Sequence, residues 1–282
     1  MLKAGILIFT DLDATLLDSD TYSFDAAGPA LAKIREYGIP LIIASSKTRA
    51  EIEPMTELRS LSKVFIVENG SAIFLDRDFS PPPGIQAELK SGYRVVVLGR
   101  RYSEIVHALH SARSLWSLCN ITVKGFFDMT AEEIAALTGL KPGSAARAKE
   151  REFSEPFIFK GSLSDLRSLR EALEEKGITV SEGGRLFHAQ GNADKGAAAR
   201  LVMETYRYAY PEISWKSVAL GDGPNDEEML KFADIAVIIR KPDGSLLDYA
   251  PSPLQRVISS AAAGPAGWNE AILRIIREEC TG

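Results

Sequence analysis

The chain has few cysteines and no long apolar run. Its 282 residues include only two cysteines, Cys119 and Cys280, which lie far apart and lack metal-ligand spacing. We therefore expect neither a disulfide scaffold nor a zinc site. We do expect a reducing, cytoplasmic location. Because no apolar run approaches about 20 residues, we do not expect a transmembrane helix. Residues 1–3 lead straight into a strand pattern, which differs from a signal peptide.

An excess of positive charge is also absent. The chain has 33 Lys and Arg residues against 38 Asp and Glu residues, for a formal net charge of −5. Nucleic-acid-binding proteins are usually basic, so a nucleic-acid partner is not expected, whereas a small anionic ligand needs only a local basic pocket. Hydrophobic residues make up 45% of the chain, which is enough for the cores of one large domain or two smaller ones.

The first 84 residues alternate between strand and helix patterns. Short apolar runs indicate strands, and amphipathic segments lie between them. Gly38 follows the first amphipathic segment and is expected to end that helix. This alternation predicts an α/β fold with a doubly wound parallel sheet. The expected strands are 5–10, 39–44, 64–67 and 71–75, the last as a hairpin partner, and the expected helices are 25–37 and 48–60.

The pattern changes after three consecutive prolines at 81–83, which suit a linker. Residues 85–189 mix strand and helix signals less regularly, and the alternation returns at 190–282. We therefore expect a core formed by 1–84 and 190–282, with an α+β cap domain at 85–189 inserted in its middle. The expected later elements are strands 94–98, 153–159, 178–180, 185–188, 217–220 and 235–239, and helices 102–118, 131–139, 162–176, 194–208, 225–233 and 267–279.

Two carboxylates, Asp11 and Asp13, stand where the first predicted strand ends. Ligand sites of open α/β sheets form at this edge, and crowded carboxylates call for a cation or a shared proton. A divalent metal beside a carboxylate nucleophile would satisfy both conditions and suggests chemistry on a phosphate ester. The alternative is an acidic turn. Asp76 and Asp78 have the same spacing after another apolar run, so the spacing alone does not decide.

A second acidic cluster, with Asp222 and Asp226, follows the strand predicted at 217–220. The flanking Gly221 and Gly223 permit a tight turn and a close ligand. Oxygen ligands of this kind select hard cations such as Mg²⁺. A turn followed by a helix cap is the other interpretation.

Ser45 and Lys195 open two further segments. Ser45 follows the second strand, where its hydroxyl can donate to a phosphoryl oxygen, or it can simply cap the next helix. Lys195 begins another predicted helix, where it can neutralise a carboxylate and a phosphate together, or it can be an ordinary surface charge.

These four segments, in this order, resemble the four motifs of the haloacid dehalogenase phosphohydrolase superfamily. The resemblance covers nearly the whole chain and implies a Rossmann-like core with a cap. It also implies that Asp11 is the nucleophile that forms an aspartyl-phosphate and that Asp13 is the general acid and base. Ser45 and Lys195 would hold the phosphoryl group, and Asn225 would contact phosphate or order its loop. The implied Mg²⁺ ligands are Asp11, the Asp13 carbonyl and Asp222, with Asp226 supporting them.

One residue departs from the family pattern. The residue after the second Asp is usually glycine, and here it is Ala14. If this position requires a positive φ, alanine costs roughly 1 kcal/mol. Because the carboxylates themselves are intact, we expect activity to survive.

A narrower resemblance is to the mannosyl-3-phosphoglycerate phosphatases. It rests on five strings, which are 45–51 (SSKTRAE), 67–70 (VENG), 151–156 (REFSEP), 184–188 (GRLFH) and 264–270 (GPAGWNE). The implied substrate carries a phosphate and a carboxylate beside a neutral sugar, so it calls for cations and hydroxyl-binding groups. The candidate substrate-binding residues are Lys47, Asn69, Arg151, Ser154, Glu155, Arg185, His188 and Asn225.

The leading hypothesis is therefore Mg²⁺-dependent hydrolysis of mannosyl-3-phosphoglycerate to mannosylglycerate and phosphate. A related sugar-phosphate phosphatase, acting for example on glucosyl-3-phosphoglycerate, is the first alternative. A phosphomutase, which must retain its intermediate, and a non-catalytic sugar-phosphate-binding protein are the others. The only partner implied is the small-molecule substrate, and the oligomeric state stays open.

Overall fold

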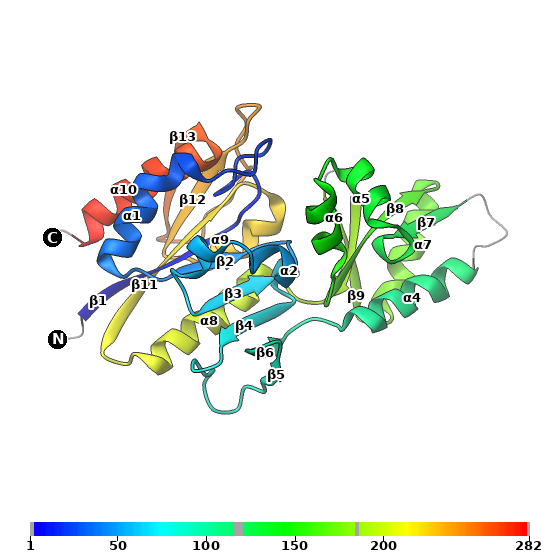
Figure 1. Cartoon of the computed structure of the whole chain (residues 1–282), viewed down its shortest axis with the longest axis horizontal. Helices are drawn as coiled ribbons and strands as arrows, with labels where there is room; N and C mark the ends of the chain where they lie inside the picture. The colour runs from blue at the N-terminus through cyan, green and yellow to red at the C-terminus, as the bar shows by residue number, and fades with distance from the viewer. Residues whose placement is uncertain (1–2, 116–120, 184–185, 281–282) are drawn as a thin grey trace. The chain divides into compact units, whose positions relative to one another are not determined.

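The structure is a computed structural model that describes residues 3–115, 121–183 and 186–280 (Figure 1). The chain forms two compact units. The core unit comprises Met1–Ser46, Thr56–Val96 and Asp194–Gly282, and the inserted unit comprises Lys47–Met55 and Val97–Ala193. The insertion expected at 85–189 thus begins later, because the two strands at 88–97 belong to the core sheet.

The core unit is built on a nine-stranded sheet with the order β13-β12-β11-β1-β2-β3-β4-β6-β5. The pairs from β13 to β3 are parallel, whereas β4 runs antiparallel to β3 and β5 antiparallel to β6. The bounds are β1 Lys3–Thr10, β2 Leu41–Ala44, β3 Val64–Val67, β4 Ala72–Asp76, β5 Glu88–Lys90, β6 Tyr93–Val97, β11 Ile213–Gly221, β12 Ile235–Arg240 and β13 Arg256–Ala263.

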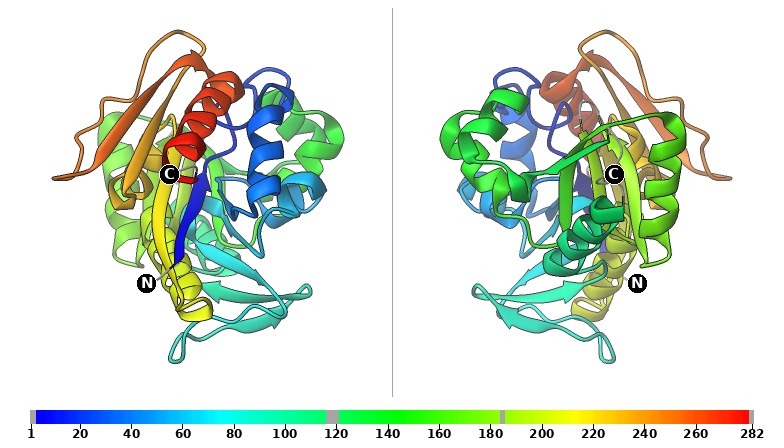
Figure 2. Two further views of the ribbon diagram at one scale, coloured as in Figure 1. Left: turned by 90° about the vertical axis from the view of Figure 1, so that its left-hand side faces the viewer. Right: turned by 90° about the vertical axis from the view of Figure 1, so that its right-hand side faces the viewer.

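Helices cover both faces of this sheet (Figure 2). Leu7, Ile8 and Phe9 are consecutive in β1 and fully buried, although successive side chains of a strand point to opposite faces. Helices α1 and α10 pack together, as do α8 and α9. The bounds are η1 Asp25–Ala27, α1 Gly28–Tyr37, α3 Thr56–Arg59, η2 Glu68–Gly70, α8 Lys195–Ala209, η4 Pro224–Asp226, α9 Glu227–Phe232 and α10 Gly264–Cys280.

The inserted unit has a four-stranded antiparallel sheet with the order β7-β8-β10-β9. Helices α4 and α7 form one apolar cluster with Phe157 of β8, and α5 and α6 form another that includes Ile158. Because Phe157 and Ile158 are adjacent, the two clusters lie on opposite faces. The bounds are α2 Arg49–Ile52, α4 Tyr102–Leu115, β7 Thr122–Gly125, η3 Phe126–Asp128, α5 Ala131–Thr138, α6 Pro142–Lys149, β8 Ser154–Lys160, α7 Leu163–Glu174, β9 Ile178–Gly183 and β10 Leu186–Gly191.

The α/β fold with a mainly parallel sheet and an inserted α+β unit is as the sequence predicts. Gly38 ends α1 with a left-handed φ of 64°, also as predicted. The single helix expected at 48–60 is wrong: it is two short helices, α2 and α3, separated at Pro54, and they belong to different units. No helix in the described part of the chain is long and apolar enough to cross a membrane.

Helix α6, the strands β5, β7 and β13, and the short 3-10 helices η2 and η3 were not expected. Helix α6 begins Pro-Gly-Ser and shows little apolar periodicity, and β13 is built largely from serine and alanine. Neither composition is typical of its element. The short strand β5 also lacks a pattern. Cys119 and the end of the helix expected at 102–118 lie outside the described residues.

Candidate active site

The carboxyl ends of β1, β2 and β11 meet at one edge of the core sheet. The parallel register pairs Thr10 with both Leu220 and Ile43. The Asp11 amide donates to the Leu220 carbonyl oxygen at 3.0 Å, and the Ser45 amide donates to the Ile66 carbonyl oxygen at 3.1 Å. The segments that follow these strands therefore begin at neighbouring points, which is the usual ligand edge of such sheets.

Lys195 is fully buried at the start of α8 and joins two carboxylates. Its Nζ lies 2.6 Å from Asp11 Oδ1 and 2.6 Å from Asp226 Oδ1. Burial alone would lower the pKa of Lys195, but these two carboxylates outweigh burial and raise the pKa above its usual range. The interpretation of Lys195 as a surface charge is therefore wrong. A buried ammonium ion needs such partners, because desolvation without them is very unfavourable.

Asp11 is 5% exposed. Burial raises the pKa of its carboxyl well above the usual range, and Lys195 offsets part of this effect. Asp226 and Asp13 raise the pKa of Asp11 further, because they add negative charge nearby. The site thus concentrates carboxylates around one lysine and electrostatically favours a further cation.

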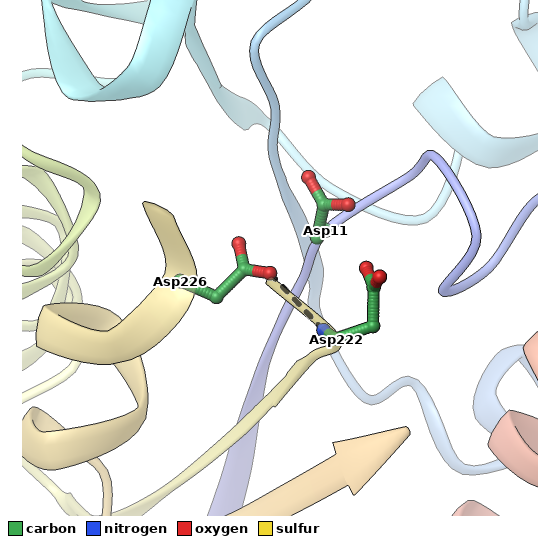
Figure 3. A group of neighbouring side chains, drawn as sticks. All are labelled: Asp11, Asp222 and Asp226. Atoms are coloured by element: carbon green, nitrogen blue, oxygen red, sulfur yellow. Dashed lines mark hydrogen bonds between the residues drawn. The ribbon is translucent and has the colours of Figure 1, made fainter. Parts of the chain in front are cut away.

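Asp226 connects the lysine to the Asp222 loop. Its Oδ2 accepts a hydrogen bond from the Asp222 amide at 3.1 Å (Figure 3) and another from the Gly223 amide at 3.0 Å, while Oδ1 accepts from Lys195. Thr15 donates its hydroxyl to Asp222 Oδ1 at 3.0 Å, and burial raises the pKa of Asp222. Both oxygens of Asp226 are therefore occupied in holding the loop and the lysine.

Asp11, Asp222 and Asp226 form a possible metal site (Figure 3). Each offers a carboxylate oxygen, and these three atoms lie within 4.8 Å of one another. All donors are hard oxygens, which fits Mg²⁺ better than a softer metal. The carboxylate of Asp13 is not in this group, although it acts electrostatically on Asp11.

The turn after Asp11 is strained at one residue. Ala14 has a φ of 56°, the left-handed conformation in which glycine is favoured. The amides of Thr15 and Leu17 donate to the Leu12 carbonyl oxygen at 3.2 and 2.7 Å, so the turn is closed on itself. The departure noted at Ala14 in the sequence is therefore a position that requires a positive φ.

Thr10 and Trp268 link the backbone of Asp11 to α10; the sequence placed Trp268 only within the string 264–270 and gave Thr10 no role. Trp268 donates its Nε1–H to Thr10 Oγ1 at 3.0 Å, and Thr10 donates to the Asp11 carbonyl oxygen at 2.7 Å. Trp268 is fully buried. These contacts join α10 to the end of β1, a link between distant residues that no local pattern indicates.

Ser45 is fully buried where β2 ends. The residue that caps the following helix α2 is Thr48, whose side chain accepts from the Glu51 amide. The interpretation of Ser45 as a helix cap is therefore wrong, which leaves the phosphate-binding interpretation open.

In the inserted unit, Arg151 donates hydrogen bonds to the side chain and carbonyl oxygen of Ser154. His188 of β10 lies opposite Pro156 of β8, so it shares a sheet face with Ser154. Burial, with a smaller contribution from Arg151, lowers the pKa of His188 to about 4. His188 is therefore neutral at pH 7, which does not suit the expected role of a cation for a carboxylate or phosphate.

Glu155 lies on the opposite face from Ser154 and His188. Its carboxylate accepts from the Tyr102 hydroxyl and from the Phe127 amide, both at 2.8 Å. Burial raises the pKa of Glu155 to about 7. The structure thus separates Glu155 from the other candidates and gives it partners within the unit.

The remaining candidates are distributed between the two units. Lys47 is 8% exposed, and its Nζ lies 3.9 Å from Glu51 Oε1. In the core unit, Asn225 donates from Nδ2 to Asn69 Oδ1 at 3.3 Å, so these two predicted residues meet. Arg185 lies outside the described residues.

Comparison with known proteins agrees with this geometry. The sequence matches the family of haloacid dehalogenase-like hydrolases over residues 8–80 and 144–252. A curated relative from Methanococcoides burtonii, named glucosyl-3-phosphoglycerate/mannosyl-3-phosphoglycerate phosphatase, is 40% identical over 276 residues, which cover 96% of this chain and 97% of the relative. A relative of the same name from Persephonella marina is 38% identical and covers 97% and 98%.

Solved structures show the same fold at low sequence identity. A Bacteroides thetaiotaomicron phosphatase of the haloalkanoate superfamily, BT1666, matches with a TM-score of 0.60 at 17% identity, covering 99% of this chain and 96% of that one. The Thermoplasma acidophilum protein 0175 matches with a TM-score of 0.61 at 17% identity, covering 99% and 100%. The chain therefore belongs to the haloacid dehalogenase-like hydrolases, in the family of the two curated phosphatases, and is a phosphoric monoester hydrolase.

Proposed function

We propose that this phosphatase hydrolyses mannosyl-3-phosphoglycerate to mannosylglycerate and phosphate, with Mg²⁺ as its cofactor. The single observation that carries the reaction type is the buried Lys195 bonded to Asp11 and Asp226, beside Asp222. The substrate class is supported by the printed names of two relatives that share nearly the full chain. Those names include the glucosyl compound, which is therefore the second candidate.

In the proposed reaction Asp11 is the nucleophile. One carboxylate oxygen attacks phosphorus in line with the leaving group, the ester P–O bond breaks, and the chain is left with an aspartyl-phosphate. Asp13 gives a proton to the departing alkoxide oxygen. It then removes a proton from water, which attacks phosphorus and releases phosphate with a regenerated Asp11. Lys195 holds Asp11 Oδ1 at 2.6 Å and so orients the carboxylate for attack.

Asp11, Asp222 and the Asp13 carbonyl would hold Mg²⁺, and Asp226 would support them through its bonds to the Asp222 loop. When bound, Mg²⁺ supplies charge neutralisation for the phosphoryl oxygens and for the crowded carboxylates. Ser45 and Lys195 would bind the same phosphoryl oxygens from the ends of β2 and α8.

Specificity for the glycerate carboxylate calls for cations. The inserted unit offers Lys47 and Arg151, both only 8% exposed. Because Arg151 is held by Ser154, its guanidinium is oriented before any ligand binds, which reduces the entropy lost on binding. The proposal therefore assigns the carboxylate to Lys47 and Arg151 and leaves neutral His188 as a hydrogen-bonding group at most.

A phosphate-release assay tests the proposal. Mannosyl-, glucosyl- and unglycosylated 3-phosphoglycerate are compared at equal concentration, each with Mg²⁺ and with excess chelator. We expect both glycosylated substrates to be cleaved faster than 3-phosphoglycerate, the mannosyl compound at least as fast as the glucosyl one, and chelator to stop all turnover. Preference for unglycosylated 3-phosphoglycerate would reject the substrate, and full turnover under chelation would reject the metal.

A further inference from the structure

The turn after β3 holds three consecutive residues in left-handed backbone conformations. The φ angles are 49° at Glu68, 58° at Asn69 and 92° at Gly70, and all three residues are buried. Two adjacent non-glycine residues in this region are unfavourable. Such strain persists only where surrounding contacts impose it, and it is concentrated at functional sites.

Asn69 connects this turn to two parts of the candidate active site. Its backbone amide donates to the Ser45 carbonyl oxygen at 3.0 Å. Its side-chain Oδ1 accepts from Asn225 Nδ2 at 3.3 Å. One strained residue therefore contacts both the end of β2 and the loop that carries Asp222 and Asp226.

Gly70 connects the same turn to a third part, the start of α8. A Cβ atom at this position would lie 2.1 Å from the Asp194 carbonyl oxygen and 2.7 Å from the Lys195 amide nitrogen. Backbone thus packs directly against backbone at the residue that carries the buried ammonium. Only glycine combines this close approach with a φ of 92°.

The geometry points to Asn69 as a positioning residue rather than a ligand for sugar hydroxyls. We propose that the strained turn Glu68–Gly70 fixes the relative places of Ser45, Lys195 and Asn225 around the phosphoryl group. The inference rests on the roles proposed above for those three residues. Its consequence is that the strain is retained at a cost in stability because the rate of phosphoryl transfer depends on this alignment.

Asn69→Gly is the main test. Glycine adopts the left-handed conformation without strain but lacks the contact to Asn225 and holds the backbone less firmly. We expect the thermal midpoint of unfolding to stay equal or rise, kcat to fall roughly 10- to 100-fold, and KM to change by less than about threefold. A merely structural turn would show the stability change without the loss of kcat, and this result would overturn the proposal.

Ser91→Gly is the matched control. Ser91 has a φ of 51° and is exposed in the turn between β5 and β6. Replacing Ser91 with glycine also relieves a left-handed backbone conformation, so we expect an equal or higher thermal midpoint with kcat unchanged. If Ser91→Gly lowers kcat as much as Asn69→Gly does, the effect is not specific to the turn and the proposal fails.

A second readout does not depend on the natural substrate. The nitrogen resonance of the Lys195 ammonium group reports its environment between two carboxylates, and we expect it to shift in Asn69→Gly and not in Ser91→Gly. Turnover is followed with para-nitrophenyl phosphate, so that a wrong sugar in the proposed function leaves this test intact. Asn69→Ala carries the same test if the glycine variant does not fold, and unchanged kcat with an unshifted resonance overturns the inference.

Discussion

Two Asp-x-Asp segments of the core unit have the same spacing but differ in burial and in the groups around them. Asp11 follows β1, is 5% exposed and is bonded to the buried Lys195. Asp76 ends β4 and pairs with Arg59 at 3.2 Å, and Asp78 pairs with Lys63 at 3.0 Å, with most of its side chain exposed. Only the first segment lies among further carboxylates.

Strand direction explains the difference. β1 is parallel to β2 and β11, so its carboxyl end meets theirs. β4 runs antiparallel to β3, and its last residue, Asp76, donates its amide to the Lys63 carbonyl oxygen at the amino end of β3. The second segment therefore lies at the opposite edge of the sheet, away from the site. Identical local chemistry acquires a function only where the topology brings other groups to it.

The largest expected effect separates the first residues of the two Asp-x-Asp segments, Asp11 and Asp76. Asp11→Asn replaces the proposed nucleophile with a poor one, and we expect kcat to fall by at least about a thousandfold with the fold intact. Asp76→Asn, its matched control, is expected to keep kcat within about twofold of wild type. Phosphate release and circular dichroism measure both, and comparable turnover by Asp11→Asn and wild type would contradict the assignment of Asp11.

The lysine partners extend the comparison. Lys195→Met leaves two buried carboxylates without their cation, and we expect a loss of about 3 kcal/mol in the free energy of unfolding together with a large drop in kcat. Lys63→Met removes an exposed partner of Asp78, and we expect little change in either quantity. Denaturant unfolding and phosphate release test this pair. Equal effects of the two substitutions would show that burial of Lys195 is not decisive.

Glu155, which is buried, and Asp78, which is exposed, should also change the free energy of unfolding with pH in opposite directions. Burial raises the pKa of Glu155 to about 7 from a usual 4.5. The contribution of Glu155 to the free energy of unfolding is therefore complete below pH 4.5 and is lost as the pH rises through 7. The shift corresponds to about 3 kcal/mol at most. The hydrogen bond from Lys63 lowers the pKa of Asp78. The contribution of Asp78 to the free energy of unfolding is therefore present above the usual pKa of an aspartate and is lost as the pH falls.

Carbon-13 NMR titration of the two carboxyl groups measures both directions. Glu155→Gln should remove the part of the pH dependence of unfolding that falls between pH 4.5 and 7. A Glu155 resonance that titrates near pH 4 would contradict the expected effect of burial.

The smallest expected effect concerns the backbone beside Asp13. Ala14→Gly relieves a φ of 56° and is expected to raise the free energy of unfolding by about 1 kcal/mol without loss of kcat. Ala197→Gly in α8 is the opposite control, because glycine within a helix is expected to lower stability by about 1 kcal/mol. Denaturant unfolding checks both signs. A destabilising Ala14→Gly would mean that the methyl group contributes packing that outweighs the strain.

Local sequence was sufficient for the strands that frame the site. β2 and β3 are short apolar runs, β1 and β11 contain such runs near their carboxyl ends, and the ends of β1, β2 and β11 mark Asp11, Ser45 and Asp222. The helix predicted at 194–208 likewise starts beside Lys195, and in the structure Asp194 caps α8. Among the elements that were missed, α6 and β13 have compositions that suit a loop, and tertiary packing rather than propensity holds them in place.

For the side chains of the inserted unit, the local sequence did not predict which sheet face they take or how far they are buried. Ser154 and Glu155 are adjacent in the string 151–156, and both were predicted to bind the same substrate. Alternation along β8 sends them to opposite faces, where Ser154 contacts Arg151 and Glu155 contacts Tyr102. The neutral state of His188 depends on burial, which no local pattern reports.

By itself, the sequence determined the α/β class, the strand ends that carry the acidic residues, and the family, because apolar periodicity and motif order are properties of the chain. Tertiary structure alone decided which Asp-x-Asp segment meets a buried lysine, which face of the sheet each β8 residue takes, and that the strained turn Glu68–Gly70 contacts Ser45, Asn225 and the start of α8. The physical reason is that burial, charge pairing and strand direction arise only between residues brought together from distant parts of the chain.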